Sequence, residues 1–159
     1  MTGTKDTREG DGVTYVDDIA IAANTGAPVL ITGGSSAERD ACARFIHASG
    51  AVAKGPFVPH CHRLTMRPGA LEDVETLQHQ FDLARGGTLF IDDVAALTPR
   101  AQRDLLSELG KDGWAPVRVI SGTDGRIDVK RAASLFDDAL FYRLNVIRID
   151  LGARAQEHA

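Results

Sequence analysis

Two groups of residues have the types and the spacing to act on a phosphate-containing ligand. The first, residues 33–40, follows an apolar run that predicts a strand. Its spacing is that of a phosphate-binding loop, G-x-x-x-x-G-K-[ST], in which backbone N–H groups hold the phosphates and a lysine contacts the outer ones. The loop positions are Gly33, Gly34, Ser35, Ser36, Ala37, Glu38, Arg39 and Asp40. Glu38 therefore stands at the second glycine and Arg39 at the lysine.

The acidic pair Asp92 and Asp93 is the second group. It follows TLFI, residues 88–91, an apolar run that predicts another buried strand. Carboxylates at such a position hold magnesium at nucleotide sites, in part through water, so Asp92 is the candidate metal ligand. Both groups also have a structural interpretation. Residues 33–40 would then be a turn that the fold requires before a helix, and the two acids would be exposed at the end of a strand.

The elements that must position these residues are read from hydrophobic spacing. Short apolar runs predict buried strands, and repeats of three and four residues predict helices. Strands are expected at 28–32, 55–61, 88–91, 117–121 and 145–151, and helices near 15–23, 36–49, 68–87, 98–109 and through 135–140. In the helix at 36–49, Ala41, Phe45 and Ala48 have the spacing of a buried face. The alternation indicates an α/β fold, a three-layer αβα sandwich with a mainly parallel five-stranded sheet.

Length and composition indicate one globular domain. The chain has 159 residues, and 43% of them are hydrophobic, a typical fraction. Residues 1–12 are polar and predict a disordered tail, 13–151 form the core, and 152–159 form a C-terminal tail. A net charge of −4 provides no basic field for nucleic acid, and no stretch approaches the roughly 20 apolar residues that span a bilayer. We therefore expect a cytoplasmic protein with no direct DNA binding and no membrane contact.

Four segments in order resemble the central AAA+ domain of the sigma-54-dependent transcriptional activators, the bacterial enhancer-binding proteins. The segments are ITGGSSAERD, GGTLFIDDVAAL, VISGTDGRI and LFDDALFYRLNVIRIDL. The family has ITGESGTGKE, GGTLFLDE, VIAATN and FREDLYYRLNV at these places. The resemblance extends from about Val13 to Leu151. It implies a P-loop NTPase core that binds ATP and magnesium and assembles into rings.

The departures from the family pattern change the charge of the implied ATP site. Glu38 places a carboxylate beside the polyphosphate, and like charges about 4 Å apart repel by on the order of several kcal/mol at a partly buried site. Arg39 keeps a positive charge, but its planar fork does not replace a compact ammonium. Ser36 and Glu38 also remove glycines that let the backbone approach the phosphates. We therefore expect the loop to repel ATP.

The other catalytic positions also differ. Asp93 is one methylene shorter than the family's water-orienting glutamate, and errors near 1 Å can lower a rate about a hundredfold. Asp124 stands at the sensor asparagine. Asp137 stands at the first of two arginines that reach into a neighbouring subunit's site, and Arg143 matches the second. The resemblance therefore implies a degenerate P-loop ATPase with no competent catalytic residue.

Two family elements are also expected to be missing. Only 24 residues separate Cys61 from Gly86, which is too short for the inserted loop with a GAFTGA-like motif that contacts the sigma factor. The chain ends soon after Leu151, before the family's helical lid and its helix-turn-helix. The implied function is that of a regulatory protein-binding module in bacterial transcription control, with no cofactor. Its partner would be a competent AAA+ activator or another transcription regulator, and homo-oligomerisation stays open.

A second hypothesis is an enzyme. In this alternative the chain is a residual ATP-binding or weak ATPase domain that uses Arg39, Asp92 and Arg143 with ATP and Mg²⁺. Titration with ATP and Mg²⁺ distinguishes the two hypotheses, because millimolar or absent binding supports the first and micromolar binding supports the second. A nucleotide seated along the loop, with Arg39 pointing at it, would overturn the expectation that the loop repels ATP.

Overall fold

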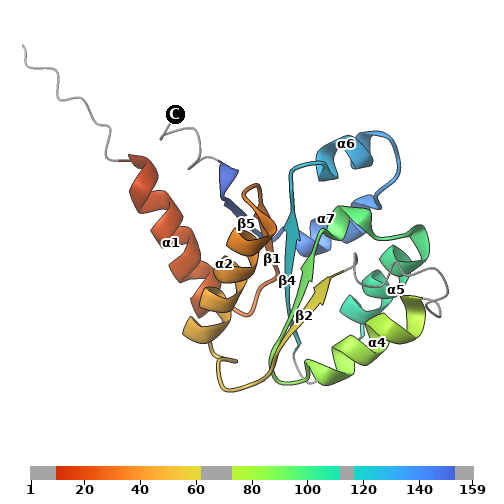
Figure 1. Ribbon diagram of the computed structural model, residues 1–159, viewed down its shortest axis with the longest axis horizontal. Coiled ribbons are helices and arrows are strands. Elements are labelled where there is room, and N and C mark those ends of the chain that lie inside the picture. The colour runs from red at the N-terminus through yellow and green to blue at the C-terminus, as the bar shows by residue number, and fades with distance from the viewer. Residues whose placement is uncertain (1–9, 62–72, 112–116, 153–159) are drawn as a thin grey trace, which may run out of the picture.

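The computed structural model describes residues 10–61, 73–111 and 117–152, and helices alternate with strands along them (Figure 1). In chain order the elements are α1 (Gly10–Asn24), β1 (Val29–Thr32), α2 (Ser36–Ser49), β2 (Phe57–Cys61), α4 (Asp73–Leu83), β3 (Thr88–Asp92), the short 3₁₀ helix η1 (Val94–Ala96), α5 (Pro99–Leu109), β4 (Arg118–Thr123), α6 (Ile127–Ala132), α7 (Asp138–Leu144) and β5 (Ile147–Asp150). The predicted alternation is confirmed.

The five strands form one sheet in the order β2-β3-β4-β1-β5, and each neighbouring pair is parallel. Because the strands are parallel, their carboxyl ends lie at one edge of the sheet. The register places Thr32 of β1 opposite Thr123 of β4, and Ile91 of β3 opposite Ser121 of β4. The loop after β1 and the acids that end β3 therefore lie at the same edge, separated by β4.

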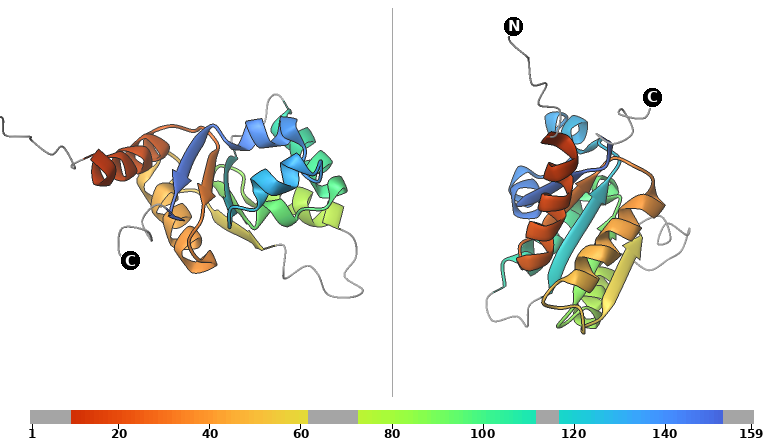
Figure 2. Two further views of the ribbon diagram at one scale, coloured as in Figure 1. Left: turned by 90° about the horizontal axis from the view of Figure 1, so that it is seen from above. Right: turned by 90° about the vertical axis from the view of Figure 1, so that its left-hand side faces the viewer.

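Helices cover both faces of the sheet, as the two views in Figure 2 show. Ile31 and Phe90 pack on the side of α1 and α2, whereas Leu30, Leu89 and Ile91 pack on the side of α4, α5 and α7. Every residue of β1, β3 and β4 is buried, as expected for parallel strands between two helical layers. The three-layer αβα sandwich is confirmed.

The helix ends follow local sequence signals. Thr98 caps α5 by accepting a hydrogen bond from the N–H of Ala101 at 3.2 Å, and Pro99 occupies the first turn, where its missing N–H has no cost. Gly50 follows α2.

α1 begins at Gly10, three residues before the core boundary predicted at Val13. The rest of the two predicted tails, residues 1–9 and 153–159, lies outside the described residues, as does much of the interval after Cys61.

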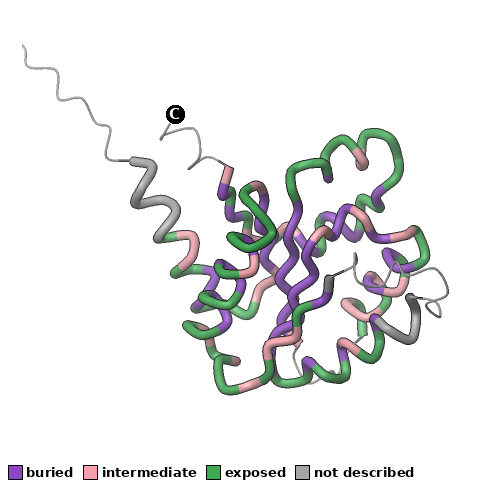
Figure 3. Tube along the Cα trace, in the orientation of Figure 1, coloured by how far each residue is buried: buried purple, intermediate pink, exposed green. Residues whose placement is uncertain are grey.

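The predicted buried face of α2 is wrong. Ala41, Phe45 and Ala48 are exposed, and in the tube of Figure 3 the outer side of this helix is largely exposed. The buried positions of α2 are Arg39, Cys42, Ala43, Ile46 and His47. α2 carries two stripes at helical spacing, and spacing alone does not say which one faces the sheet. The stripe with the larger aliphatic residue Ile46 does.

None of the described helices is both long enough and apolar enough to span a membrane.

Candidate functional site

Two glycines shape the loop after β1. Gly33 and Gly34 adopt φ of 75° and 65°, left-handed values that glycine reaches without strain. The N–H of Gly33 donates to the carbonyl of Thr123 at 3.0 Å, which ties the loop to β4. A Cβ on Gly33 would lie 2.6 Å from the backbone nitrogen of Gly152, after β5. The loop is therefore packed against the end of the last strand, and this position requires glycine.

Glu38 lies in the first turn of α2. Ser35 is the N-cap, and its Oγ accepts from the N–H of Glu38 at 3.1 Å while donating to Glu38 Oε1 at 3.2 Å. Ser35 therefore satisfies one free N–H group in the first turn, and its hydroxyl group also holds the Glu38 carboxylate. A carboxylate is also favourable there because the helix dipole is positive at this end. Glu38 thus places the protein's own anion at the helix end where a phosphate loop receives its ligand.

Arg39 points into the protein. It is only 6% exposed, and its Nε donates to Asp92 Oδ1 at 2.7 Å while Nη2 lies 3.4 Å from Asp92 Oδ2. Its Nη1 donates to the carbonyls of Gly34 at 2.8 Å and Gly33 at 3.2 Å. All three guanidinium nitrogens therefore bond to groups of the loop and of β3.

Ser36 completes the set of partners around Asp92. Its Oγ donates to Asp92 Oδ2 at 2.5 Å. Burial by itself raises the pKa of Asp92, but hydrogen bonds from Arg39 and Ser36, the charge of Arg39 and the backbone N–H of Asp93 outweigh it, so the pKa lies below its ordinary value. Asp92 is therefore a buried, ionised carboxylate with hydrogen bonds to both oxygens.

Gly122 of β4 provides the space for this ion pair. A Cβ at this position would lie 2.5 Å from Asp92 Oδ1 and 3.2 Å from Cδ of Arg39. The first contact is shorter than real Cβ atoms show and the second is tight, so a methyl group fits only if a neighbour shifts. The sequence interpretation did not single out Gly122, although a glycine inside a buried strand is a recognised sign of a close approach by another group.

Gly122→Ala is expected to lower the free energy of unfolding by about 1–3 kcal/mol, because the added methyl forces Asp92 or Arg39 out of place. Urea denaturation followed by circular dichroism measures the change. Gly110→Ala is the matched control, since a Cβ there has its nearest contact at 3.5 Å, with the carbonyl of Leu106. Equal midpoints for the two variants would contradict the tight fit at Gly122.

The Arg39–Asp92 ion pair does not include the predicted site residues Ala37, Asp40 and Asp124. Ala37 is exposed in the first turn of α2. Asp40 pairs with Arg44 on the same helix, with Arg44 Nε 2.7 Å from Asp40 Oδ2. Asp124, which follows β4, accepts from the N–H of Arg126 at 3.2 Å and lies 3.3 Å from Nε of that residue. Asp93 follows Asp92 in a left-handed conformation, with φ of 57°.

The two positions aligned with intersubunit arginines lie on α7. Asp137 is the N-cap of this helix, where its Oδ1 accepts from the N–H of Leu140 at 2.8 Å. Arg143 donates to the carbonyl of Leu109, the last residue of α5, at 3.3 Å. In the described structure both residues therefore have roles in joining and capping helices.

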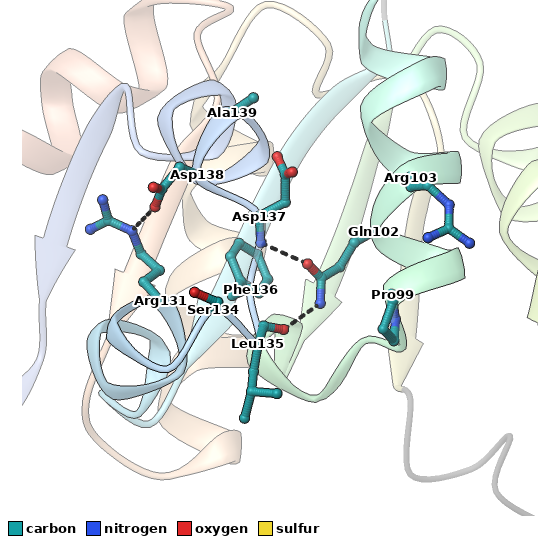
Figure 4. Close-up of a pocket in the computed structure, with 10 residues that line it drawn as sticks. All are labelled: Pro99, Gln102, Arg103, Arg131, Ser134, Leu135, Phe136, Asp137, Asp138 and Ala139. Atoms are coloured by element: carbon teal, nitrogen blue, oxygen red, sulfur yellow. Dashed lines mark hydrogen bonds and ion pairs between the residues drawn. The ribbon is translucent and has the colours of Figure 1, made fainter.

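A cavity of about 510 Å³ lies between α5 and the segment that joins α6 to α7 (Figure 4). Gln102 lines this cavity and links α5 to the segment before α7. The Nε2 of Gln102 donates to the carbonyls of Leu97 and Leu135, both at 3.0 Å. The Oε1 of Gln102 accepts from the N–H of Asp137 at 2.8 Å. Arg131 pairs with Asp138 at 3.1 Å. The cavity is lined by mixed charges and is separate from the Arg39–Asp92 ion pair.

At the positions that the family resemblance assigns to ATP and magnesium, side chains bond to other groups of this chain. The side chain at the lysine position bonds to Asp92 and to loop carbonyls, and the candidate metal ligand accepts hydrogen bonds at both oxygens. Among the described residues, no group of three or more His, Cys, Asp or Glu side chains is arranged to hold a metal ion.

Known proteins match nearly the whole chain. Residues 14–153 match the family described as the Sigma-54 interaction domain. The response regulator protein PilR of Pseudomonas aeruginosa is 33% identical over 84% of this chain and 35% of its own. The DNA-binding transcriptional regulator NtrC of Escherichia coli is 30% identical over 77% of this chain and 31% of its own. The chain thus spans about a third of these relatives.

Solved structures match as well. NtrX from Brucella abortus in complex with ATP aligns with a TM-score of 0.73 and 28% identity over 94% of this chain and 39% of its own. The P-loop NTPase domain of a sigma-54 activator from E. coli aligns with a TM-score of 0.66 and 27% identity over 86% of this chain and 98% of its own. The family match covers far more than half of the residues. The chain belongs to the sigma-54 interaction domain family, the AAA+ domain of bacterial sigma-54-dependent transcriptional activators.

Proposed function

We propose that this sigma-54 interaction domain is a regulatory protein-binding module that does not hydrolyse ATP. The observation that carries the proposal is the direction of Arg39. This residue is 6% exposed and bonds to Asp92 at 2.7 Å, so the positive charge at the lysine position is neutralised inside the protein. An ATPase needs that charge on the outer phosphates.

The energetic cost of admitting a nucleotide supports the proposal. ATP would have to separate the buried Arg39–Asp92 pair, and leaving one partner of such a pair unpaired costs about 3–5 kcal/mol. It would also have to displace the Glu38 carboxylate from the start of α2 or lie against it. Both costs oppose binding, and Asp93 and Asp124 add negative charge after β3 and β4.

The intact fold supports a role that depends on shape. The sheet order and the helix caps are those of a well-formed domain, although the loop no longer suits its ligand. The family resemblance implies that such domains assemble with one another. We therefore propose a competent AAA+ activator of the same family as the partner, with this chain acting on that protein's assembly or its ATPase rate.

The test mixes the purified chain with the ATPase domain of a competent sigma-54 activator. We expect the two to co-elute in size-exclusion chromatography and the activator's ATPase rate to change as this chain is added. In isothermal titration of this chain alone with ATP and Mg²⁺, we expect no binding with a dissociation constant tighter than about 1 mM. The activator domain is the positive control.

Each outcome of the test is informative. Absence of both co-elution and a rate effect would remove the protein-binding proposal. Binding of ATP by this chain tighter than about 10 µM, accompanied by phosphate release, would establish the alternative of a weak ATPase.

A further inference from the structure

The outer face of α2 carries an uncharged stripe that no described residue covers. Its members are Ala37, Ala41, Phe45 and Ala48, all exposed, with Phe45 at 59%. At 3.6 residues per turn these four positions lie on one side of the helix, opposite the buried Ile46. Single exposed apolar residues are common. Here an exposed aromatic ring instead stands in a row with three small residues along the helix.

The two sides of this stripe differ in charge. Asp40 and Arg44 lie along one side and form an ion pair of 2.7 Å. Arg44 also lies 4.5 Å above the ring of Phe57 in β2, which keeps this side ordered. Glu38 lies on the other side, held by Ser35. One side of the stripe therefore presents an acid and a base in sequence along the helix.

We propose that the α2 stripe is a homodimer contact in which two copies of this chain pack their α2 helices antiparallel about a two-fold axis. A two-fold axis reverses the direction of the second helix and brings the same side of each helix together. Asp40 of one copy then faces Arg44 of the other, and the reverse pair forms at the same time. The stripe is thus complementary in charge to itself.

The small residues make the contact sterically suitable. In an antiparallel pair centred between residues 41 and 45, the ring of Phe45 faces Ala41 of the second copy, where a methyl group leaves room for it. Small residues let two helices approach closely. A helix of 14 residues is about 21 Å long, so the contact is small and we expect a dissociation constant of about 1–100 µM.

The test measures the mass of the full chain by sedimentation velocity over about 2–200 µM. Wild type is expected to shift from monomer to dimer within this range. Phe45→Glu is expected to weaken the dimer at least about tenfold, since it places a carboxylate against the methyl group of Ala41 in the apolar centre of the contact. Leu83→Glu is the matched control, because Leu83 is a 50% exposed apolar residue at the end of α4, on the other side of the sheet.

A charge exchange tests the orientation. Asp40→Arg alone is expected to weaken the dimer, and the double variant Asp40→Arg with Arg44→Asp is expected to restore it, because the two-fold pair forms again with the charges reversed. Wild type that stays monomeric throughout the range, equal effects of Phe45→Glu and Leu83→Glu, or a double variant no better than the single one would each overturn the proposal. These results do not depend on whether the chain binds a competent activator.

Discussion

Replacing Arg39 with alanine is expected to lower the free energy of unfolding by about 3–5 kcal/mol at pH 7. This is the largest effect among the substitutions that we propose. The substitution leaves the Asp92 carboxylate buried, with Ser36 as its remaining side-chain donor. It also leaves the carbonyls of Gly33 and Gly34 without their guanidinium donor. Urea denaturation followed by circular dichroism gives the value.

The effect of this substitution is expected to depend on pH. In wild type the pKa of Asp92 lies below its ordinary value of 3.8, so its stabilising contribution is full above pH 3.8 and is lost as the pH falls through the lowered value. Without Arg39, burial raises the pKa of Asp92, and the protonated carboxyl then costs little to bury. The difference between Arg39→Ala and wild type should therefore shrink as the pH falls from 7 to about 4.

Arg44→Ala is the matched control for Arg39→Ala. It removes an arginine of the same helix whose ion pair with Asp40 is exposed, and we expect the free energy of unfolding to fall by only about 0.3–0.5 kcal/mol.

A double-mutant cycle tests the ion pair directly. The double variant Arg39→Ala with Asp92→Ala should lose less stability than the sum of its single variants, because neither charge is left unpaired. Strict additivity, or an Arg39→Ala loss equal to that of Arg44→Ala, would contradict the ion-pair assignment.

Gln102→Ala is expected to lower the free energy of unfolding by about 2–4 kcal/mol. Gln102 is 4% exposed, and its amide is the partner of two carbonyls, those of Leu97 and Leu135, and of the N–H of Asp137 (Figure 4). Removing one side chain leaves buried backbone groups unsatisfied, at about 1–3 kcal/mol each before water reaches them. Thermal or urea denaturation measures the loss.

The substitution also tests how α5 holds the segment before α7. Hydrogen exchange at the N–H of Asp137 should speed up in Gln102→Ala, because this N–H loses its acceptor. Arg103→Ala on the next position of α5 is the control, since Arg103 is exposed and its loss should change stability by less than about 0.5 kcal/mol. A Gln102→Ala protein as stable as Arg103→Ala would show that water replaces the amide without cost.

Some of the site was readable from the sequence and some was not. The contact between Ser35 and Glu38 could have been read from S-x-x-E at residues 35–38, a local signal of a helix start that the phosphate-loop comparison obscured. The Arg39–Asp92 pair joins residues 53 positions apart, and spacing carries no information about such a contact. Gly122 in a buried strand signals the close approach of some group, but the sequence does not say that this group is the Arg39–Asp92 ion pair.

The sequence by itself determined the family and the alternation of strands and helices, because motif strings and hydrophobic periodicity are properties of neighbouring residues. The tertiary structure decided where Arg39 points and which of two stripes of α2 is buried. Both depend on groups contributed by distant strands, β3 and β4, that no local pattern places beside α2. A buried arginine needs an anion beside it, and in this domain the fold places the Asp92 carboxylate next to Arg39.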